Sequence, residues 1–202
     1  RSAAAYVLLA KELRHGLYRD FLSDVRLVPA GASNSGYYHG ARYYDPAYNQ
    51  MLEPPPLGRF GPQAVVGMTG CPALVATVRT LAASPNAIGP RLCLAEFFRT
   101  NGFDEFELDA PLADSGLASS RSPFPGPLYS RLEVYKSIID DPAATADQRA
   151  LALNRAIRCY APSGNNSCGG NEVGLDQRRA WFVRLKRDFE SSEWSRSLSY
   201  YW

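Results

Sequence analysis

The sequence predicts an all-α protein: one domain of 202 residues, built as an irregular solenoid of antiparallel helical hairpins. Two observations predict this fold class. Apolar residues recur every three or four positions in several segments, as they do along one face of an amphipathic helix. Strict alternation of apolar and polar residues, which is typical of half-buried strands, is not evident outside one irregular segment. The composition, 46% apolar and 21% charged, is ordinary for a globular protein with a core.

The first expected helix begins near the start of the sequence and stops before Pro29. Its apolar face consists of Tyr6, Leu9, Leu13, Leu17 and Phe21. From residue 28 to residue 70 Gly, Pro, Asn and Ser are dense, and three consecutive prolines at 54–56 exclude helix. This range is expected to be a long irregular insertion rich in Gly, Pro and Tyr.

Three helical hairpins are expected after this insertion. In the first, Pro72 and Pro90 suit the opening turns of two helices, and Asn101-Gly102 suits the end of the second helix. A second irregular insertion covers about 103–126. Pro127 is expected to open the next helix, which stops at Asp140. Further helices are expected from the remaining apolar stripes, which are Ala150, Leu153, Ile157 and Tyr160; Trp181, Phe182, Leu185 and Phe189; and Trp194, Leu198 and Tyr201.

A capping box is expected where Thr145 precedes Gln148 by three residues. In this motif each side chain satisfies a free backbone N–H of the first helical turn. The sequence therefore predicts that a helix begins directly after Thr145.

The four cysteines, Cys71, Cys93, Cys159 and Cys168, are even in number, and none of their spacings is C-x-x-C. This predicts neither a zinc ribbon nor a thioredoxin-type site and suits two disulfides. Four buried free thiols in a cytosolic protein are the alternative. The four cysteines allow three disulfide pairings, and the sequence does not choose among them. In a straight hairpin Cys71 and Cys93 would lie at opposite ends, which counts against their direct pairing. Disulfides predict a periplasmic or outer-envelope (secreted) protein.

The last hairpin carries the pattern Ala180-Trp181-Phe182-x-x-Leu185-x-x-x-Phe189-x-Ser191-x-x-Trp194-Ser195-x-x-Leu198. It resembles the Ala…Phe-x-x-Leu…Tyr-Pro-x-Ser-x-Tyr-Ala segment of tetratricopeptide-like (TPR-like) proteins of the bacterial envelope, among them outer-membrane assembly lipoproteins and soluble lytic transglycosylases. Glu190 stands where that family carries Pro, and the hairpins do not repeat every 34 residues. The catalytic Glu-Ser of the transglycosylases is not carried over to Glu190-Ser191, because the Gly-x-Met-Gln segment that should follow is missing. The resemblance implies an irregular helical-repeat protein with a concave binding or scaffolding surface.

A second motif, Gly36-Tyr37-Tyr38-His39-Gly40-Ala41-Arg42-Tyr43-Tyr44-Asp45-Pro46, is similar to the core motif of RHS/YD-repeat proteins. In that family the motif belongs to a β-rich shell that encloses a toxin. Here there is one copy, with helical sequence on both sides, and Pro55 stands where the family has Asp. Shared ancestry would make the chain a fragment of an RHS-like exported system.

The same segment supplies the candidate binding residues, because five of the twelve tyrosines lie within twelve positions. Rigid amphipathic rings with polar neighbours suit stacking on a sugar or capture of a peptide. Aromatic anchoring of a long loop on a helical body is the structural alternative. The candidates are Tyr37, Tyr38, His39, Arg42, Tyr43 and Tyr44.

No residue receives a catalytic role, and neither a metal site nor a cofactor is predicted. The acidic group formed by Glu96, Asp104, Glu105, Glu107 and Asp109 cannot be told from a solvated acidic loop. A net charge of +2 argues against a dedicated nucleic-acid binder, and no apolar run is long enough for a membrane span. The leading hypothesis is a non-enzymatic adaptor or scaffold of the cell envelope that binds a protein partner. The alternative is a helical protein that binds or processes a glycan.

Overall fold

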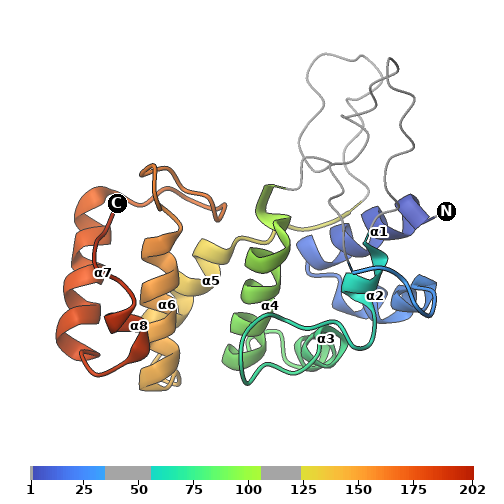
Figure 1. The fold of residues 1–202 in the computed structure, drawn as a ribbon, viewed down its shortest axis with the longest axis horizontal. Coiled ribbons are helices and arrows are strands. Elements are labelled where there is room, and N and C mark those ends of the chain that lie inside the picture. Colours follow the sequence, from blue (N-terminus) through green and yellow to red (C-terminus); the bar gives the residue numbers. More distant parts are fainter. Residues whose placement is uncertain (1, 35–55, 106–123) are drawn as a thin grey trace, which may run out of the picture.

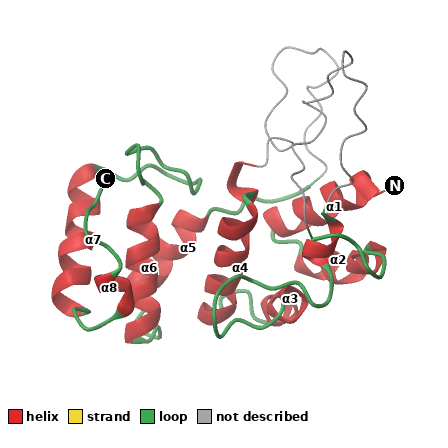
Figure 2. Ribbon diagram, in the orientation of Figure 1, coloured by secondary structure: helices red, strands yellow, loops and turns green. Residues whose placement is uncertain are grey.

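The computed structural model describes residues 2–34, 56–105 and 124–202 (Figure 1). These residues form helices and loops, and Figure 2 shows no strand among them, so the prediction of an all-α protein is confirmed for the described part of the chain. The α-helices are α1 (Ser2–Arg14), α2 (Tyr18–Asp24), α3 (Leu74–Ala83), α4 (Ile88–Asn101), α5 (Arg131–Ile139), α6 (Ala146–Arg158), α7 (Leu175–Asp188) and α8 (Glu193–Arg196). Short 3₁₀ turns are η1 (Val25–Leu27), η3 (Leu57–Phe60) and η4 (Phe103–Glu105).

The helices form an elongated row in which each element packs mainly on its neighbours in the sequence (Figure 1). α3 packs on α4, α5 on α6, and α6 on both α7 and α8. The two ends of the chain lie at opposite ends of the long axis. This arrangement leaves α4 near the middle of the row, between an N-terminal and a C-terminal group of helices.

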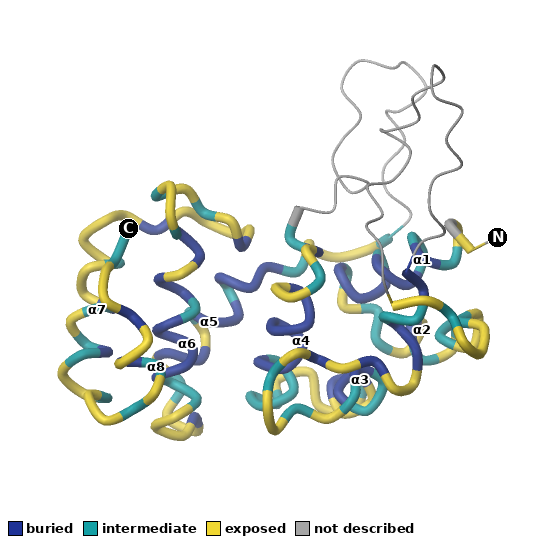
Figure 3. The backbone as a smooth tube through the Cα atoms, in the orientation of Figure 1, coloured by how far each residue is buried: buried dark blue, intermediate teal, exposed yellow. Residues whose placement is uncertain are grey.

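Two hydrophobic cores stabilise the row, and α4 belongs to both (Figure 3). Residues 92–98 of α4 are all buried. Leu92 and Ala95 pack into the C-terminal core, whereas Leu94, Phe97 and Phe98 pack into the N-terminal core. A helix that is buried on opposite faces cannot carry a single apolar stripe, which explains the nearly continuous apolar sequence here.

The prediction of one continuous first helix is wrong, because its apolar stripe is divided between α1 and α2. Gly16 has a φ of +68° and ends α1. The Leu17 N–H donates to the Glu12 carbonyl (2.8 Å), and the Gly16 N–H donates to the Leu13 carbonyl (3.2 Å). This pair of bonds is a Schellman motif, which satisfies the last helical carbonyls and turns the chain.

The predicted start of the helix after the second insertion is also wrong. α5 begins at Arg131, four residues after Pro127, because the preceding residues are bonded elsewhere. The Tyr129 N–H donates to the Arg14 carbonyl (2.6 Å), and the Arg131 N–H donates to the Cys168 carbonyl (3.1 Å). Ser130 caps the helix by accepting a hydrogen bond from the Glu133 N–H.

The last expected helix is only one turn long. α8 ends at Arg196, and Leu198 and Tyr201 continue as non-helical chain. α6 captures this continuation, since Arg158 donates to the Ser197 carbonyl (2.6 Å) and Asn154 donates to the Ser197 hydroxyl (3.1 Å). Hydrogen bonds from two α6 side chains therefore hold the chain after α8 against α6, although this part of the chain is not helical.

The predicted capping box at α6 is confirmed. The Thr145 hydroxyl accepts from the Gln148 N–H (3.2 Å), and the Gln148 Oε1 accepts from the Thr145 N–H (2.9 Å). The predicted end of α4 is confirmed too, because Gly102 follows it in the left-handed conformation with a φ of +69°.

The four cysteines form two disulfides, Cys71–Cys93 and Cys159–Cys168. The concern that Cys71 and Cys93 lie at opposite ends of a hairpin does not apply. Cys71 precedes α3 in a segment that runs back along α4 from Val66, whose carbonyl accepts from the Thr100 hydroxyl (3.5 Å). Two disulfides are consistent with an exported protein.

Candidate functional site

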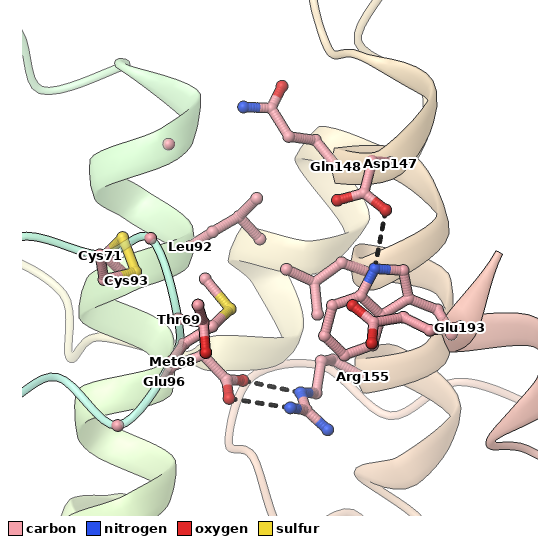
Figure 4. Close-up of a pocket in the computed structure, with 15 residues that line it drawn as sticks. Met68, Thr69, Cys71, Leu92, Cys93, Glu96, Asp147, Gln148, Arg155 and Glu193 are labelled. Carbon is pink, nitrogen blue, oxygen red and sulfur yellow. Dashed lines mark hydrogen bonds and ion pairs between the residues drawn. A yellow bond between two sulfur atoms is a disulfide. The ribbon is translucent and has the colours of Figure 1, made fainter.

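A cleft of about 510 Å³ lies where the two cores meet, and Figure 4 shows the side chains around it. One wall is formed by α4 and the segment 67–71, and the other by α6 and α8. Met68, Leu92 and Leu151 give it an apolar surface, and the Cys71–Cys93 disulfide lies in its α4 wall. Its volume lies within the range of ~300–1,000 Å³ that is usual for ligand sites.

The wall formed by residues 67–71 depends on a glycine. Gly67 has a φ of +86°, and a Cβ there would lie 2.8 Å from the Thr100 Cγ2. Only a residue without a side chain lets the backbone lie this close to α4 while adopting a left-handed conformation. Thr69 and Gly70 follow it and are exposed at the cleft.

A buried ion pair closes the base of the cleft. Glu96 of α4 is 1% exposed, and both its oxygens accept from Arg155 of α6, at 2.7 Å from Nε and 2.9 Å from Nη2 (Figure 4). Arg99 adds a hydrogen bond of 3.0 Å from its Nε. Such bidentate pairing compensates the cost of burying a carboxylate. It also joins the α4 wall to the α6 wall.

The opposite end of the cleft is polar. Asp147 lies in the first turn of α6, and its Oδ1 accepts from the Trp194 indole N–H (3.0 Å). Glu193 precedes Trp194 in α8 and is exposed. The oxygen of the Gln148 carboxamide is held in the capping box. The Nε2 of the same group faces Gly89 of α4 and would lie 3.9 Å from a Cβ atom at that position. The indole of Trp194 also lies over the Arg155 guanidinium, at 5.4 Å from the ring centre.

This arrangement suits binding better than proton transfer. The buried carboxylate, Glu96, is engaged by two arginines, so it ties the walls together. An apolar floor with a few fixed polar groups at its edge is the usual composition of a binding site.

The predicted binding residues, Tyr37, Tyr38, His39, Arg42, Tyr43 and Tyr44, all lie outside the described residues. The hypothesis that they bind a ligand therefore stays a prediction. The described end of the first insertion, from Pro56 onward, packs on the N-terminal core through Leu57 and Phe60, which are buried.

Two members of the acidic group considered in the sequence, Glu96 and Asp104, lie in separate ion pairs. Glu96 pairs with Arg155, whereas Asp104 pairs with Arg131, whose Nη2 lies 2.7 Å from Oδ2. Glu107 and Asp109 lie outside the described residues. Burial of Glu96 and Asp104 shows that these two carboxylates do not belong to a solvated loop.

Several cations of the basic helix α7 are paired or hydrogen-bonded. Arg184 lies 2.6 Å from the Asp140 carboxylate and Arg187 lies 2.6 Å from Asp188. Lys186 donates to the Ser195 carbonyl (2.5 Å). These contacts agree with a solvated, internally paired face.

No family model, no curated protein and no solved structure matched the chain in the comparisons with known proteins. Its relation to TPR-like and RHS-like proteins rests on the sequence resemblances alone. In the described part of the chain, no helix has the length and apolar character needed to cross a membrane. In the same residues, no group of three or more His, Cys, Asp or Glu could hold a metal ion.

A second buried acid lies far from the cleft, between α1 and α2. Glu12 is 3% exposed, and its Oε2 has no hydrogen-bond partner among the described residues. Burial, together with a hydrogen bond and a like charge from Asp24 and the charge of Asp20, raises the pKa of Glu12 to about 8. Near neutral pH this side chain holds a proton that an exposed glutamate would release.

Reasoning from the sequence missed the cleft, whose residues come from four separate segments. Two signals were present. Glu96 interrupts an apolar run in α4, which is where a buried, paired carboxylate is expected. The capping box already placed Gln148 and Asp147 in the first turn of α6, although nothing in the sequence indicated that this turn faces α4.

Proposed function

We propose that this chain is a non-enzymatic binding module of the periplasm or outer envelope that seats a segment of a protein partner in the cleft. One observation carries the proposal: an open, partly apolar cleft at the junction of the two cores, with its base closed by the Glu96–Arg155 ion pair. A rigid cleft with a partly apolar lining and a few polar groups favours recognition. The paired cysteines support export, and the last-hairpin resemblance supports an irregular helical-repeat scaffold.

Gly89 offers a direct test, because a side chain at this position would enter the cleft. The nearest atom to its Cβ position is the Gln148 Nε2 at 3.9 Å, and no positive φ is required, so the Cβ of Gly89→Phe meets no clash and its ring is expected to occupy the cleft. Gly174→Phe is the matched control, since nothing lies within 4 Å of the Cβ position there.

The experiment is selection of phage-displayed random heptapeptides on the immobilised full chain. The wild-type protein and Gly174→Phe are expected to enrich the same peptides, and Gly89→Phe is expected to lose them. Enrichment that is equal on all three proteins, or no enrichment on any, overturns the proposal. Circular dichroism establishes that the variants are folded.

Glycan binding through the tyrosine-rich segment is the second candidate, and the five clustered tyrosines favour it. It predicts that Tyr43→Ala together with Tyr44→Ala abolishes retention on an insoluble glycan while the helicity stays unchanged. Loss of helicity in this double variant would instead identify the tyrosines as structural anchors.

A further inference from the structure

The charges that line the cleft do not cancel. Glu96 and Arg155 neutralise each other at the base, with Nε and Oε1 2.7 Å apart. Asp147 and Glu193 remain, on the wall formed by α6 and α8. Figure 4 shows both carboxylates on the same wall, opposite Leu92.

No cation among the described residues forms an ion pair with these two carboxylates. Arg91 donates to the Ser137 hydroxyl (2.8 Å), and Arg196 donates to the Ser191 carbonyl. One oxygen of Asp147 is held by the indole N–H, which fixes the carboxylate in the cleft and leaves its second oxygen for a ligand. The cleft is therefore lined by two carboxylates that have no cationic partner among the described residues.

The remainder of the cleft suits the flanks of an extended peptide. Met68 is half-buried and offers a contact to an apolar side chain, whereas Leu92 and Leu151 line the cleft but are buried. Beside them Thr69 and Gly70 expose main chain, and nothing lies within 4 Å of the Cβ position of Gly70. A basic side chain has an aliphatic stem that packs on apolar surface and a charged head that reaches a carboxylate.

We infer that the cleft selects a peptide segment in which a lysine or arginine is adjacent to an apolar residue. The basic head lies between Asp147 and Glu193, and the apolar residue lies on Met68. This inference rests on the proposed function, since it specifies which segment that cleft accepts. An acidic segment is repelled by the same two carboxylates.

The test uses variants that remove charge and keep shape. Asp147→Asn retains an oxygen that can accept from the Trp194 indole, and Glu193→Gln retains the side-chain length. The control is Glu172→Gln together with Glu190→Gln, two exposed acids outside the cleft. Thermal unfolding of each protein reports whether the first turns of α6 and α8 tolerate the changes, because acids in these turns favour the helix.

The heptapeptide selection is repeated on wild-type protein, on the double amide variant and on the double control. The peptides enriched on wild-type protein and on the control are expected to contain Lys or Arg at about twice the library frequency or more, and this excess disappears on the double amide variant. A synthetic copy of an enriched peptide is expected to bind the double amide variant about tenfold more weakly and to lose affinity as the salt rises from about 0.05 M to about 0.5 M.

Two results overturn the inference, and they can be told apart. Peptides that depend on an open Gly89 but show no excess of basic residues, or keep that excess on the double amide variant, refute the selectivity and leave the proposed function in place. Peptides that are indifferent to Gly89→Phe refute the proposed function, and the inference with it.

Discussion

The buried carboxyl group of Glu12 makes the stability of this protein depend on pH in an unusual direction. Its pKa is 4.5 in an exposed chain and about 8 in the folded protein, because burial disfavours the ionised form and Asp24 adds a hydrogen bond and a like charge. Between these values the folded protein binds a proton that the unfolded chain has released. The free energy of unfolding therefore falls as the pH rises through this window.

The size of the effect follows from the two pKa values. Between about pH 5.5 and about pH 8.5, linkage through Glu12 lowers the free energy of unfolding by about 3 kcal/mol. The stabilising contribution is fully present below about pH 4.5 and is lost by about pH 8, where the folded protein also ionises. Glu12→Gln removes the ionisation and retains a side chain that can donate to Asp24.

Urea denaturation at the two pH values tests the reasoning. The stability of Glu12→Gln relative to wild type is expected to increase by about 3 kcal/mol from about pH 5.5 to about pH 8.5. Glu190→Gln, at an exposed position, is the control and should run parallel to wild type. If the free energies of wild type and Glu12→Gln run parallel over this range, Glu12 is not a buried, protonated acid and the reasoning fails.

Three further predictions concern stability, each measured by urea denaturation. Thr145→Ala should cost about 1 kcal/mol, since it removes one half of the capping box, and an unchanged midpoint would contradict that role. Replacing Cys159 and Cys168 together by Ala should cost roughly 2.7 kcal/mol from loop-closure entropy, and no loss would contradict the constraint on the unfolded chain. Glu96→Gln should cost about 3 kcal/mol because it leaves a guanidinium without its anion, whereas Glu133→Gln, in a solvent-exposed pair, should cost less than about 1 kcal/mol.

The helices could be predicted because their apolar spacing and end signals lie close together in the sequence. Thr145 with Gln148, and Gly102 after Asn101, are local signals, and each is found where it was expected. Gly16 is a local signal for the end of a helix as well. The three-to-four-residue spacing of apolar residues nevertheless continues past it at Leu17 and Phe21, so this spacing predicted one helix where the structure has α1 and α2.

The start of α5 and the end of α8 could not be read from the sequence, because distant partners decide them. Residues before α5 are held by the carbonyls of Arg14 and Cys168, and the chain after α8 is held by Arg158. The cleft has the same origin, since its walls are brought together by the contact of α4 with α6. A linear pattern contains no information about which carbonyl or carboxylate arrives from elsewhere.

The membership of α4 in both cores limits how the chain can be divided. A cut before α4 would leave the N-terminal helices without Leu94, Phe97 and Phe98, and a cut after it would remove Leu92 and Ala95 from the C-terminal helices. Neither half is then self-sufficient, although the row of helices looks divisible in outline. A truncated or recombined protein that still folds must contain α4 together with whichever set of helices it keeps. Two complementary fragments would compete for the same α4.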